Sequence, residues 1–169
     1  MRLKILSLLS ALLLVAACAT DAEDTAGKSG SGAGSGGAGA GAVAVEPGTV
    51  QDFIVNVGDR VFFDFDKSTL SAKSQETLDK QAAWLTRISA ATIMVEGHCD
   101  ERGTREYNLA LGARRAAAAR DFLVSLGVAG NRMETVSYGK ERPLDPRANE
   151  EAWSVNRNAH SQIVSGAVS

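Results

Sequence analysis

Residues 95–115, VEGHCDERGTREYNLALGARR, contain the end of a strand, a loop and the start of a long helix in one continuous run. The strand-like part ends in Gly-His-Cys-Asp, Gly103 lies in the loop, and a helical pattern follows. Asn108 and Arg115 are seven residues apart, nearly two helical turns, so they share one helix face with Leu111 between them. Asp100 enters from the end of the strand, which places one anion and one cation near a common opening.

Asp100 and Arg115 together have the chemistry to hold a small zwitterion. A carboxylate holds an ammonium group, and a planar guanidinium holds a carboxylate through two parallel hydrogen bonds. Ligand sites in α/β folds also favour the loops at the carboxyl ends of strands. The alternative is an internal salt bridge between Asp100 and Arg115 that braces the loop. The spacing alone does not choose between ligand binding and bracing.

Hydrophobic periodicity predicts the remaining elements of the domain. A short amphipathic helix, with apolar residues at 50, 53, 54 and 57, begins near Thr49 and is stopped by Gly58. Ser71 is a candidate N-cap of a second helix, and Gly127 is a C′ residue that ends a helix over 106–126. Strands are expected over 60–65, 92–98, 133–139 and 159–164, with a helical turn or two over 149–155.

The predicted element order is α-β-α-β-α-β-(α)-β. A sheet of so few strands offers the helices one face to cover, so we expect an α/β (α+β) two-layer sandwich with helices on one face. The helix between the second and third strands is long enough for a crossover, which favours a mixed four-stranded sheet.

The N-terminal segment has the pattern of a secretory signal. Residues 1–17 have a basic start and an apolar run too short to span a bilayer as a mature helix. Val15-Ala16-Ala17-Cys18 resembles the bacterial lipobox, which predicts that Cys18 is lipidated and carries acyl chains such as palmitate. The alternative is an ordinary signal peptide with an incidental cysteine. Position 19 is Ala rather than Asp, which favours the outer membrane over retention in the inner membrane.

These patterns divide the chain into a signal peptide over 1–17, a lipidated cysteine and flexible Gly/Ala/Ser linker over 18–48, and one folded domain over 49–169. The linker cannot bury enough apolar surface to offset its ordering entropy. The folded part is long enough for one core. The net charge of −2 gives no general electrostatic reason to expect nucleic acid as a partner.

Four motifs in one frame carry a resemblance to a known family. They are FFDFDK at 62–67, the central stretch at 95–116, SYGKERP at 137–143 and WSVNRNA at 153–159. Together they resemble the OmpA-like C-terminal domain family and, within it, the branch of peptidoglycan-associated lipoproteins. The resemblance covers about residues 50–164.

The resemblance implies non-covalent binding of peptidoglycan through meso-diaminopimelate in its stem peptide. Asp100 matches the aspartate that takes the ammonium group of the ligand, and Arg115 matches the arginine that takes its carboxylate. Asn108 matches a polar contact in the same pocket. By the same resemblance, Phe65 and Asp66 lie in a loop that closes over the ligand, and Leu111 forms a wall of the pocket.

The resemblance further implies partners and a setting. It implies a role in the Tol–Pal system in envelope integrity and cell division, with TolB and other Tol proteins as partners and the domain facing the periplasm. The alternative is another OmpA-like peptidoglycan-binding lipoprotein without a Tol partner. The chain departs from the family pattern at Cys99, where a small or polar residue is usual, and at Asn158, which replaces an arginine.

An enzymatic role is not expected, and neither is a cofactor or a metal. His98, Cys99, Asp100 and Glu101 are adjacent, but neighbours in a strand point to opposite faces, so His98 and Cys99 cannot both point at one ion or substrate without a bend. Cys99 has no base positioned beside it by local sequence, as a nucleophilic cysteine requires. Cys18 and Cys99 are far apart and match neither a disulfide framework nor a zinc pattern.

Overall fold

The computed structural model of the chain describes residues 45–168. The predicted signal peptide, the predicted lipidation site at Cys18 and most of the predicted linker lie outside the described residues. In chain order the elements are α1 (Val50–Asp52), η1, a π-helical turn (Phe53–Val57), β1 (Arg60–Phe62), α2 (Ala72–Arg87), β2 (Thr92–His98), α3 (Arg105–Ser125), η2, a 3₁₀ turn (Gly130–Arg132), β3 (Met133–Gly139), α4 (Glu150–Asn156) and β4 (Asn158–Ser165).

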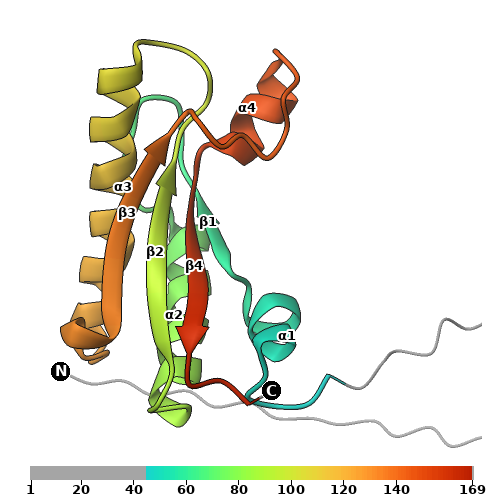
Figure 1. Cartoon of the computed structure of the whole chain (residues 1–169), viewed down its shortest axis with the longest axis vertical. Coiled ribbons are helices and arrows are strands. Elements are labelled where there is room, and N and C mark those ends of the chain that lie inside the picture. The colour runs from blue at the N-terminus through green and yellow to red at the C-terminus, as the bar shows by residue number, and fades with distance from the viewer. Residues whose placement is uncertain (1–44, 169) are drawn as a thin grey trace, which may run out of the picture. The chain divides into compact units, whose positions relative to one another are not determined.

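The four strands form one mixed sheet in the order β1-β4-β2-β3 (Figure 1). β4 is antiparallel to both β1 and β2, whereas β2 and β3 are parallel and are joined through α3. Val95 lies opposite Thr135 of β3 and Ser161 of β4, in the middle of the sheet. The predicted mixed four-stranded sheet is confirmed.

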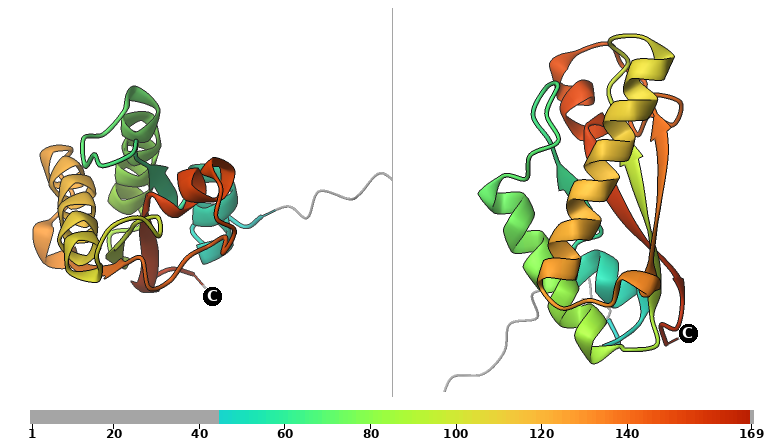
Figure 2. Two further views of the ribbon diagram at one scale, coloured as in Figure 1. Left: turned by 90° about the horizontal axis from the view of Figure 1, so that it is seen from above. Right: turned by 90° about the vertical axis from the view of Figure 1, so that its left-hand side faces the viewer.

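The two long helices, α2 and α3, cover the same face of the sheet, as the two views of Figure 2 show. Between them and the strands lies a core of aliphatic and aromatic side chains, including Leu78, Leu85, Ile93, Val95 and Leu123, each no more than 1% exposed. Burying each such side chain contributes about 1.5–3 kcal/mol. The predicted two-layer sandwich with its helices on one face is therefore confirmed.

α3 approaches the sheet closely because glycines meet at the contact. A Cβ added to Gly97 in β2 would overlap the carbonyl oxygen of Gly112 in α3. A Cβ added to Gly112 would overlap the Ser137 Oγ of β3. This contact holds the first half of α3, which carries the predicted binding residues, against the carboxyl ends of β2 and β3.

The predicted helix over 50–57 differs from the observed one. The chain makes a single α turn and then a π turn, so that Phe53 is fully buried while Val50 and Ile54 remain 44% and 45% exposed. Asp52 faces inward at this turn, and its buried carboxylate accepts hydrogen bonds from the Gly48 N–H, at 2.8 Å, and from the Trp84 Nε1–H, also at 2.8 Å.

The first strand is also shorter than predicted and ends at Phe62 rather than at residue 65. Phe62 pairs with Asn158, the first residue of β4, and beyond this pair the Phe63 N–H donates to the Arg157 carbonyl at 2.9 Å, outside both strands. The residues that follow, 63–70, form the loop that leads to α2. Ser71 caps α2 as predicted, because its side chain accepts a hydrogen bond from the Ser74 N–H.

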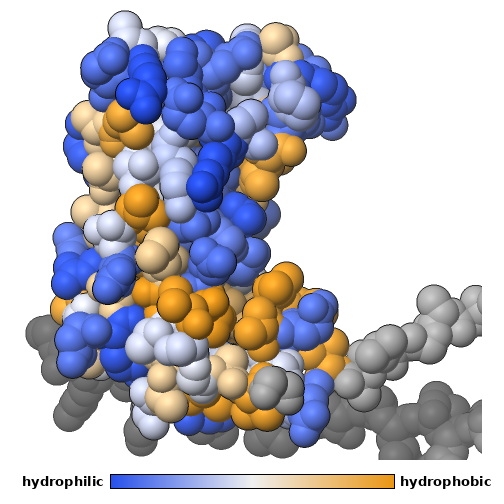
Figure 3. All heavy atoms as spheres, in the orientation of Figure 1, coloured by the Kyte–Doolittle hydropathy of each residue, from blue (hydrophilic) through white to orange (hydrophobic). Residues whose placement is uncertain are grey.

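The two ends of the domain differ in surface character. Figure 3 shows hydrophobic side chains gathered over α1 and the lower end of β4, and hydrophilic ones over the upper end. The exposed apolar residues at the lower end include Val50, Ile54, Val55 and Val164. The upper end contains the carboxyl ends of β1 and β2 and the start of α3 (Figure 1), where the predicted binding residues lie.

Candidate ligand-binding pocket

A pocket of about 160 Å³ opens between the loop after β1, the end of β2 and the first turns of α3. Its lining contains all six residues that the sequence and the family resemblance predict as ligand contacts: Phe65, Asp66, Asp100, Asn108, Leu111 and Arg115. Four further residues complete the lining: Cys99, Arg102, Gly103 and Tyr107. The fold thus brings two segments separated by more than thirty residues of chain into one small cavity.

Arg115 is buried at the floor of this pocket and is only 1% exposed. Its Nε donates to the Lys67 carbonyl at 2.9 Å, its Nη1 to the His98 carbonyl at 2.8 Å and its Nη2 to the Asp64 carbonyl at 3.2 Å. Burial lowers the pKa of the guanidinium below its ordinary value. Arg115 therefore joins the loop after β1 to the end of β2.

Asp100 pairs with Arg102 and Arg157 and not with Arg115. Its Oδ2 accepts from Arg102 Nη2 at 2.6 Å and from Arg157 Nη1 at 3.3 Å. Its Oδ1 accepts from Arg102 Nε at 3.3 Å and from the Arg102 backbone N–H at 3.1 Å. The alternative of a bracing salt bridge between Asp100 and Arg115 is wrong, because each of them is held by different groups.

The protonation of Asp100 follows from these contacts. Burial on its own would raise the pKa of the carboxyl, but the hydrogen bonds and charge of Arg102, with a further hydrogen bond from Arg157, outweigh burial and lower it below the ordinary value. Asp100 is therefore an anion at neutral pH.

Arg102 lines the pocket and lies over two aromatic rings. Its guanidinium carbon is 4.1 Å from the centre of the Phe65 ring and 4.2 Å from the centre of the Trp153 ring, which comes from α4. Its Nη1 is 3.7 Å from a carboxylate oxygen of Glu150, also in α4. Such stacking suits a guanidinium, which is planar and weakly hydrated.

Asn108, which the family resemblance predicts to be a polar ligand contact, makes two hydrogen bonds to the protein backbone. The Asn108 side chain is buried, and its Nδ2 donates to the Arg102 carbonyl at 2.8 Å and to the Thr104 carbonyl at 3.1 Å. The amide group of Asn108 therefore fixes the backbone of the loop after β2 within the pocket wall.

The loop after β1 reaches over the same opening. Phe65 is 57% exposed, and Asp66 has a positive φ of 57°, a conformation that a non-glycine residue adopts at tight turns. The Asp66 carboxylate accepts a hydrogen bond from the Tyr107 hydroxyl of α3. This contact ties the loop to the helix at the edge of the pocket.

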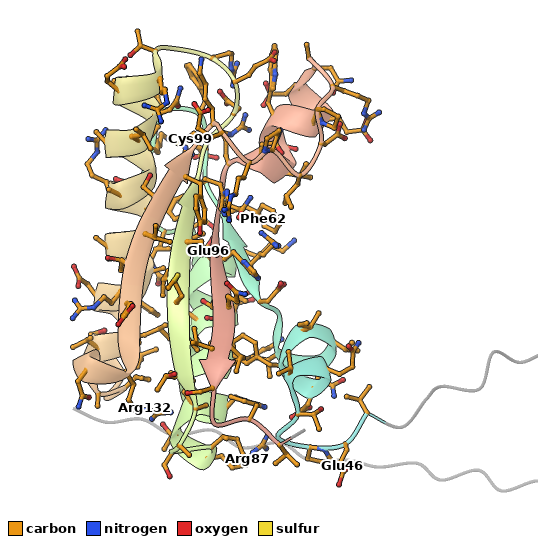
Figure 4. All side chains as sticks on the ribbon, viewed as in Figure 1. Glu46, Phe62, Arg87, Glu96, Cys99 and Arg132 are labelled. Carbon is orange, nitrogen blue, oxygen red and sulfur yellow. The ribbon has the colours of Figure 1, made fainter. Side chains whose placement is uncertain are left out.

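His98 and Cys99 face opposite sides of the sheet, as their alternation in the strand predicts. Cys99, labelled at the upper end of β2 in Figure 4, is 2% exposed, and its Sγ donates to the Asn108 carbonyl at 3.3 Å. Burial raises the pKa of the thiol above its ordinary value. His98 packs instead beside the Tyr138 ring, with the ring centres 5.6 Å apart.

The other departure from the family pattern, Asn158, is a structural residue in this chain. It is fully buried, accepts from Arg60 Nη1 at 3.2 Å and donates to the Val155 carbonyl at 2.9 Å. Within residues 45–168, no group of three or more His, Cys, Asp or Glu side chains is placed to hold a metal ion. In the same part of the chain, no helix is long and apolar enough to cross a membrane.

Four residues that contact Asp100 or Arg102 are absent from the predicted set: Arg102 itself, Arg157, Trp153 and Glu150. A signal for Arg102 exists in the sequence, because a cation two residues after Asp100 can fold back onto it. Arg157 lies 57 positions from Asp100, and nothing local connects the two. Trp153 becomes part of the site only because α4 packs beside the loop after β2.

Comparison with known proteins shows which family of domains this chain belongs to. Residues 62–157, more than half of the chain, match the OmpA family. The C-terminal domain of MotB from Helicobacter pylori has a similar fold, with a TM-score of 0.60 at 20% identity over 63% of this chain and 84% of that one. At that identity the likeness concerns the fold alone.

Relatives of higher sequence identity indicate one group of proteins within this family. The peptidoglycan-associated lipoprotein of Mesorhizobium japonicum is 60% identical over 124 residues, 73% of each chain, and that of Brucella melitensis is 59% identical over the same shares. The crystal structure of the peptidoglycan-associated lipoprotein from Burkholderia pseudomallei has a TM-score of 0.61 at 42% identity, over 62% of this chain and 89% of that one. The chain therefore belongs to the OmpA family and, within it, to the peptidoglycan-associated lipoproteins.

Proposed function

We propose that this chain binds peptidoglycan non-covalently through meso-diaminopimelate and tethers the outer membrane to the cell wall from the periplasmic side. The observation that carries the proposal is the pocket that Asp100 and Arg115 share. It offers a buried anion and a buried cation, which match the two charges at the amino-acid end of diaminopimelate. The work is binding, not catalysis, and no cofactor is part of it.

The hydrogen-bond count of Arg115 supports the role of carboxylate receptor. A guanidinium has five N–H groups, and backbone carbonyls accept from Nε, Nη1 and Nη2. One N–H remains on each Nη nitrogen, and a carboxylate takes such a pair as a planar fork. Because the side chain is already fixed by three carbonyls, binding costs little further side-chain entropy.

The pocket is small, which suits one end of a stem-peptide residue better than a sugar unit. Asp100 would take the ammonium group, and Leu111 and Phe65 would contact the aliphatic part of the ligand. The loop containing Phe65 and Asp66 would close over the ligand, with its backbone held by Arg115 and its tip by Tyr107.

The tethering part of the proposal rests on the predicted order of lipidated cysteine, linker and domain. Acyl chains on Cys18 would hold one end in the outer membrane, since several acyl chains give a stable anchor where one is marginal. A flexible linker of roughly 28 residues has a root-mean-square reach of about 30 Å and extends to about 90 Å when stretched. This span would let the domain work on the wall at a distance from the bilayer.

We further propose participation in the Tol–Pal system in envelope integrity and cell division, with TolB and other Tol proteins as partners. Family membership supports this role. Calorimetry of the folded chain with TolB tests it, and a measurable complex is the expected result. Without a complex, the chain would be a peptidoglycan-binding lipoprotein that has no Tol partner.

Co-sedimentation with diaminopimelate-type sacculi tests the binding itself. The wild-type chain in detergent should pellet with the sacculi, whereas Asp100→Ala should remain in the supernatant. Losing a charged partner of this kind costs on the order of 2–4 kcal/mol in affinity. Arg114→Ala is the matched control, because Arg114 adjoins Arg115 in sequence but is exposed outside the pocket. Equal pelleting of Asp100→Ala and wild type, with both folded, would reject the proposed ligand grip.

A further inference from the structure

The Asp100 carboxylate is already saturated by protein donors in the structure. Four N–H groups converge on its two oxygens, three of them from Arg102 and one from Arg157. A carboxylate has about four lone-pair positions, so none is left for an incoming ammonium group. Any ligand cation that binds Asp100 must therefore first replace one of these donors.

The two arginines differ in how firmly they are held. Arg157 is buried, with a side chain 8% exposed, and its Nε donates to the Phe63 carbonyl at 3.0 Å while its Nη2 bonds Glu150 at 2.8 Å. The Arg102 side chain is 31% exposed, and apart from Asp100 it contacts two aromatic faces and the more distant Glu150. Arg102 is thus the donor that can leave at lower cost.

The backbone of Arg102 stays in place when its side chain moves. The Arg102 carbonyl is held by the Asn108 Nδ2, and the next residues lead directly into the capped start of α3. Glu150, at 3.7 Å from Nη1, is a second anion on the outer side of the guanidinium. Glu150, which also accepts from Arg157, therefore offers the guanidinium a second anionic partner besides Asp100.

We infer that Arg102 is an internal competitor for the ligand cation, a specificity-determining side chain that occupies the ammonium position on Asp100 until a ligand exchanges with it. This inference rests on the proposed function, since it concerns how the same pocket admits diaminopimelate. The exchange breaks the Arg102–Asp100 ion pair and forms an ammonium–Asp100 ion pair, so Asp100 has a cationic partner both before and after the ligand binds.

Exchange makes the pocket selective for a ligand that brings both charges. An ammonium group compensates Asp100 for the lost guanidinium, and a carboxylate on the same carbon engages the two free N–H groups of Arg115. A stem peptide whose free diaminopimelate amine is acetylated offers no cation there, so Arg102 keeps its place on Asp100.

Calorimetric titration of the chain, in detergent, with a soluble diaminopimelate-containing stem peptide tests the inference. Arg102→Ala should bind about threefold to tenfold more tightly than wild type, as expected for removal of a partly exposed competing ion pair. Arg102→Lys, which keeps the charge but not the fork or the stacked plane, should lie between them. Arg105→Ala is the matched control, since it removes an arginine that pairs with Glu141 outside the pocket.

Tryptophan fluorescence gives a second readout, which would not change on ligand binding if Arg102 had only a structural role. The chain has two tryptophans, and Trp84 is 2% exposed in the core, so the response to ligand comes from Trp153. Binding to wild type should shift the emission as the guanidinium leaves the Trp153 ring. The ligand-free Arg102→Ala chain should already show most of that shift, and Trp153→Phe should show none.

The outcomes separate this inference from the proposed function. Tighter binding by Arg102→Ala, with Arg105→Ala unchanged and melting temperatures checked for every variant, supports the competition. Binding by wild type with equal or weaker binding by both Arg102→Ala and Arg102→Lys overturns the competition and leaves the proposed function standing. Absence of binding by wild type and both variants overturns the competition and the proposed ligand together.

Discussion

Asp100 and Arg115 line the same pocket, yet each is held by a different set of groups. Arg102 and Arg157 hold the carboxylate of Asp100, while backbone carbonyls of three residues hold the guanidinium of Arg115. Both charges are therefore placed before a ligand arrives, without neutralising each other. Arg115 joins two separate backbone segments, so we expect its replacement to affect the stability of the domain as well as ligand binding.

Arg115→Lys should destabilise the domain as well as weaken ligand binding. An ammonium group cannot reach the carbonyls of Lys67, His98 and Asp64 together, and unsatisfied buried carbonyls cost free energy, so we expect a loss of about 2–4 kcal/mol. Urea unfolding measures the change, with Arg114→Lys on the exposed helix face as the control. An Arg115→Lys chain as stable as the control would show that the carbonyl contacts contribute little.

Gly112→Ala should lower stability although alanine is the better helix former. The propensity gain is about 1 kcal/mol, but the added Cβ meets Ser137 Oγ and the Gly97 carbonyl, and overpacking of this kind costs about 1–3 kcal/mol plus any displacement of α3. Ala113→Gly, at the exposed neighbouring position, measures how much the alanine–glycine difference in helix propensity contributes to stability in this helix. Thermal unfolding that shows Gly112→Ala to be more stable than wild type would contradict the close contact.

The stability of the domain should fall as the pH drops below about 6.5, in part because of His98. Burial lowers the pKa of His98 from its ordinary value of 6.5; nearby Glu96 opposes this shift, and Arg60 and His160 add to it. Both ring nitrogens of His98 are buried without a hydrogen-bond partner. The unfolded chain therefore takes up the proton at a higher pH than the folded chain does, which favours unfolding in acid.

Replacement of the imidazole tests this assignment. His98→Leu should flatten the pH dependence of the free energy of unfolding in the window that begins near 6.5 and extends downward. Urea unfolding at a series of pH values measures the slope. A slope that is the same in wild type and His98→Leu would assign the acid sensitivity to other groups.

Cys99 should be protected from thiol reagents in the folded chain. It is 2% exposed, its thiol donates to the Asn108 carbonyl, and its raised pKa leaves little thiolate at neutral pH. Ellman's reagent applied to a Cys18→Ser chain should react slowly until denaturant is added. Reaction at the same rate before and after unfolding would mean that the pocket floor opens readily.

Much of the fold was predictable because its signals are local. Strands β2 and β3 begin and end where the alternating patterns do, and α2 begins after the capping Ser71. The first helix and the first strand were predicted less well, since their bounds depend on distant residues. Asp52 turns inward to meet Trp84, and β1 ends where β4 begins.

The candidate site also combines features that local sequence patterns predict with contacts that depend on tertiary packing. The sequence alone determined that Asp100 follows the end of a strand, that Asn108, Leu111 and Arg115 share a helix face, and that they lie near a common opening, because helical and strand periods act over a few residues. Only the tertiary structure decided which groups hold each charge. Arg157 reaches Asp100 across 57 positions, and Arg115 reaches the carbonyls of the loop after β1 across about fifty. Such contacts depend on how the elements pack, which no local pattern encodes.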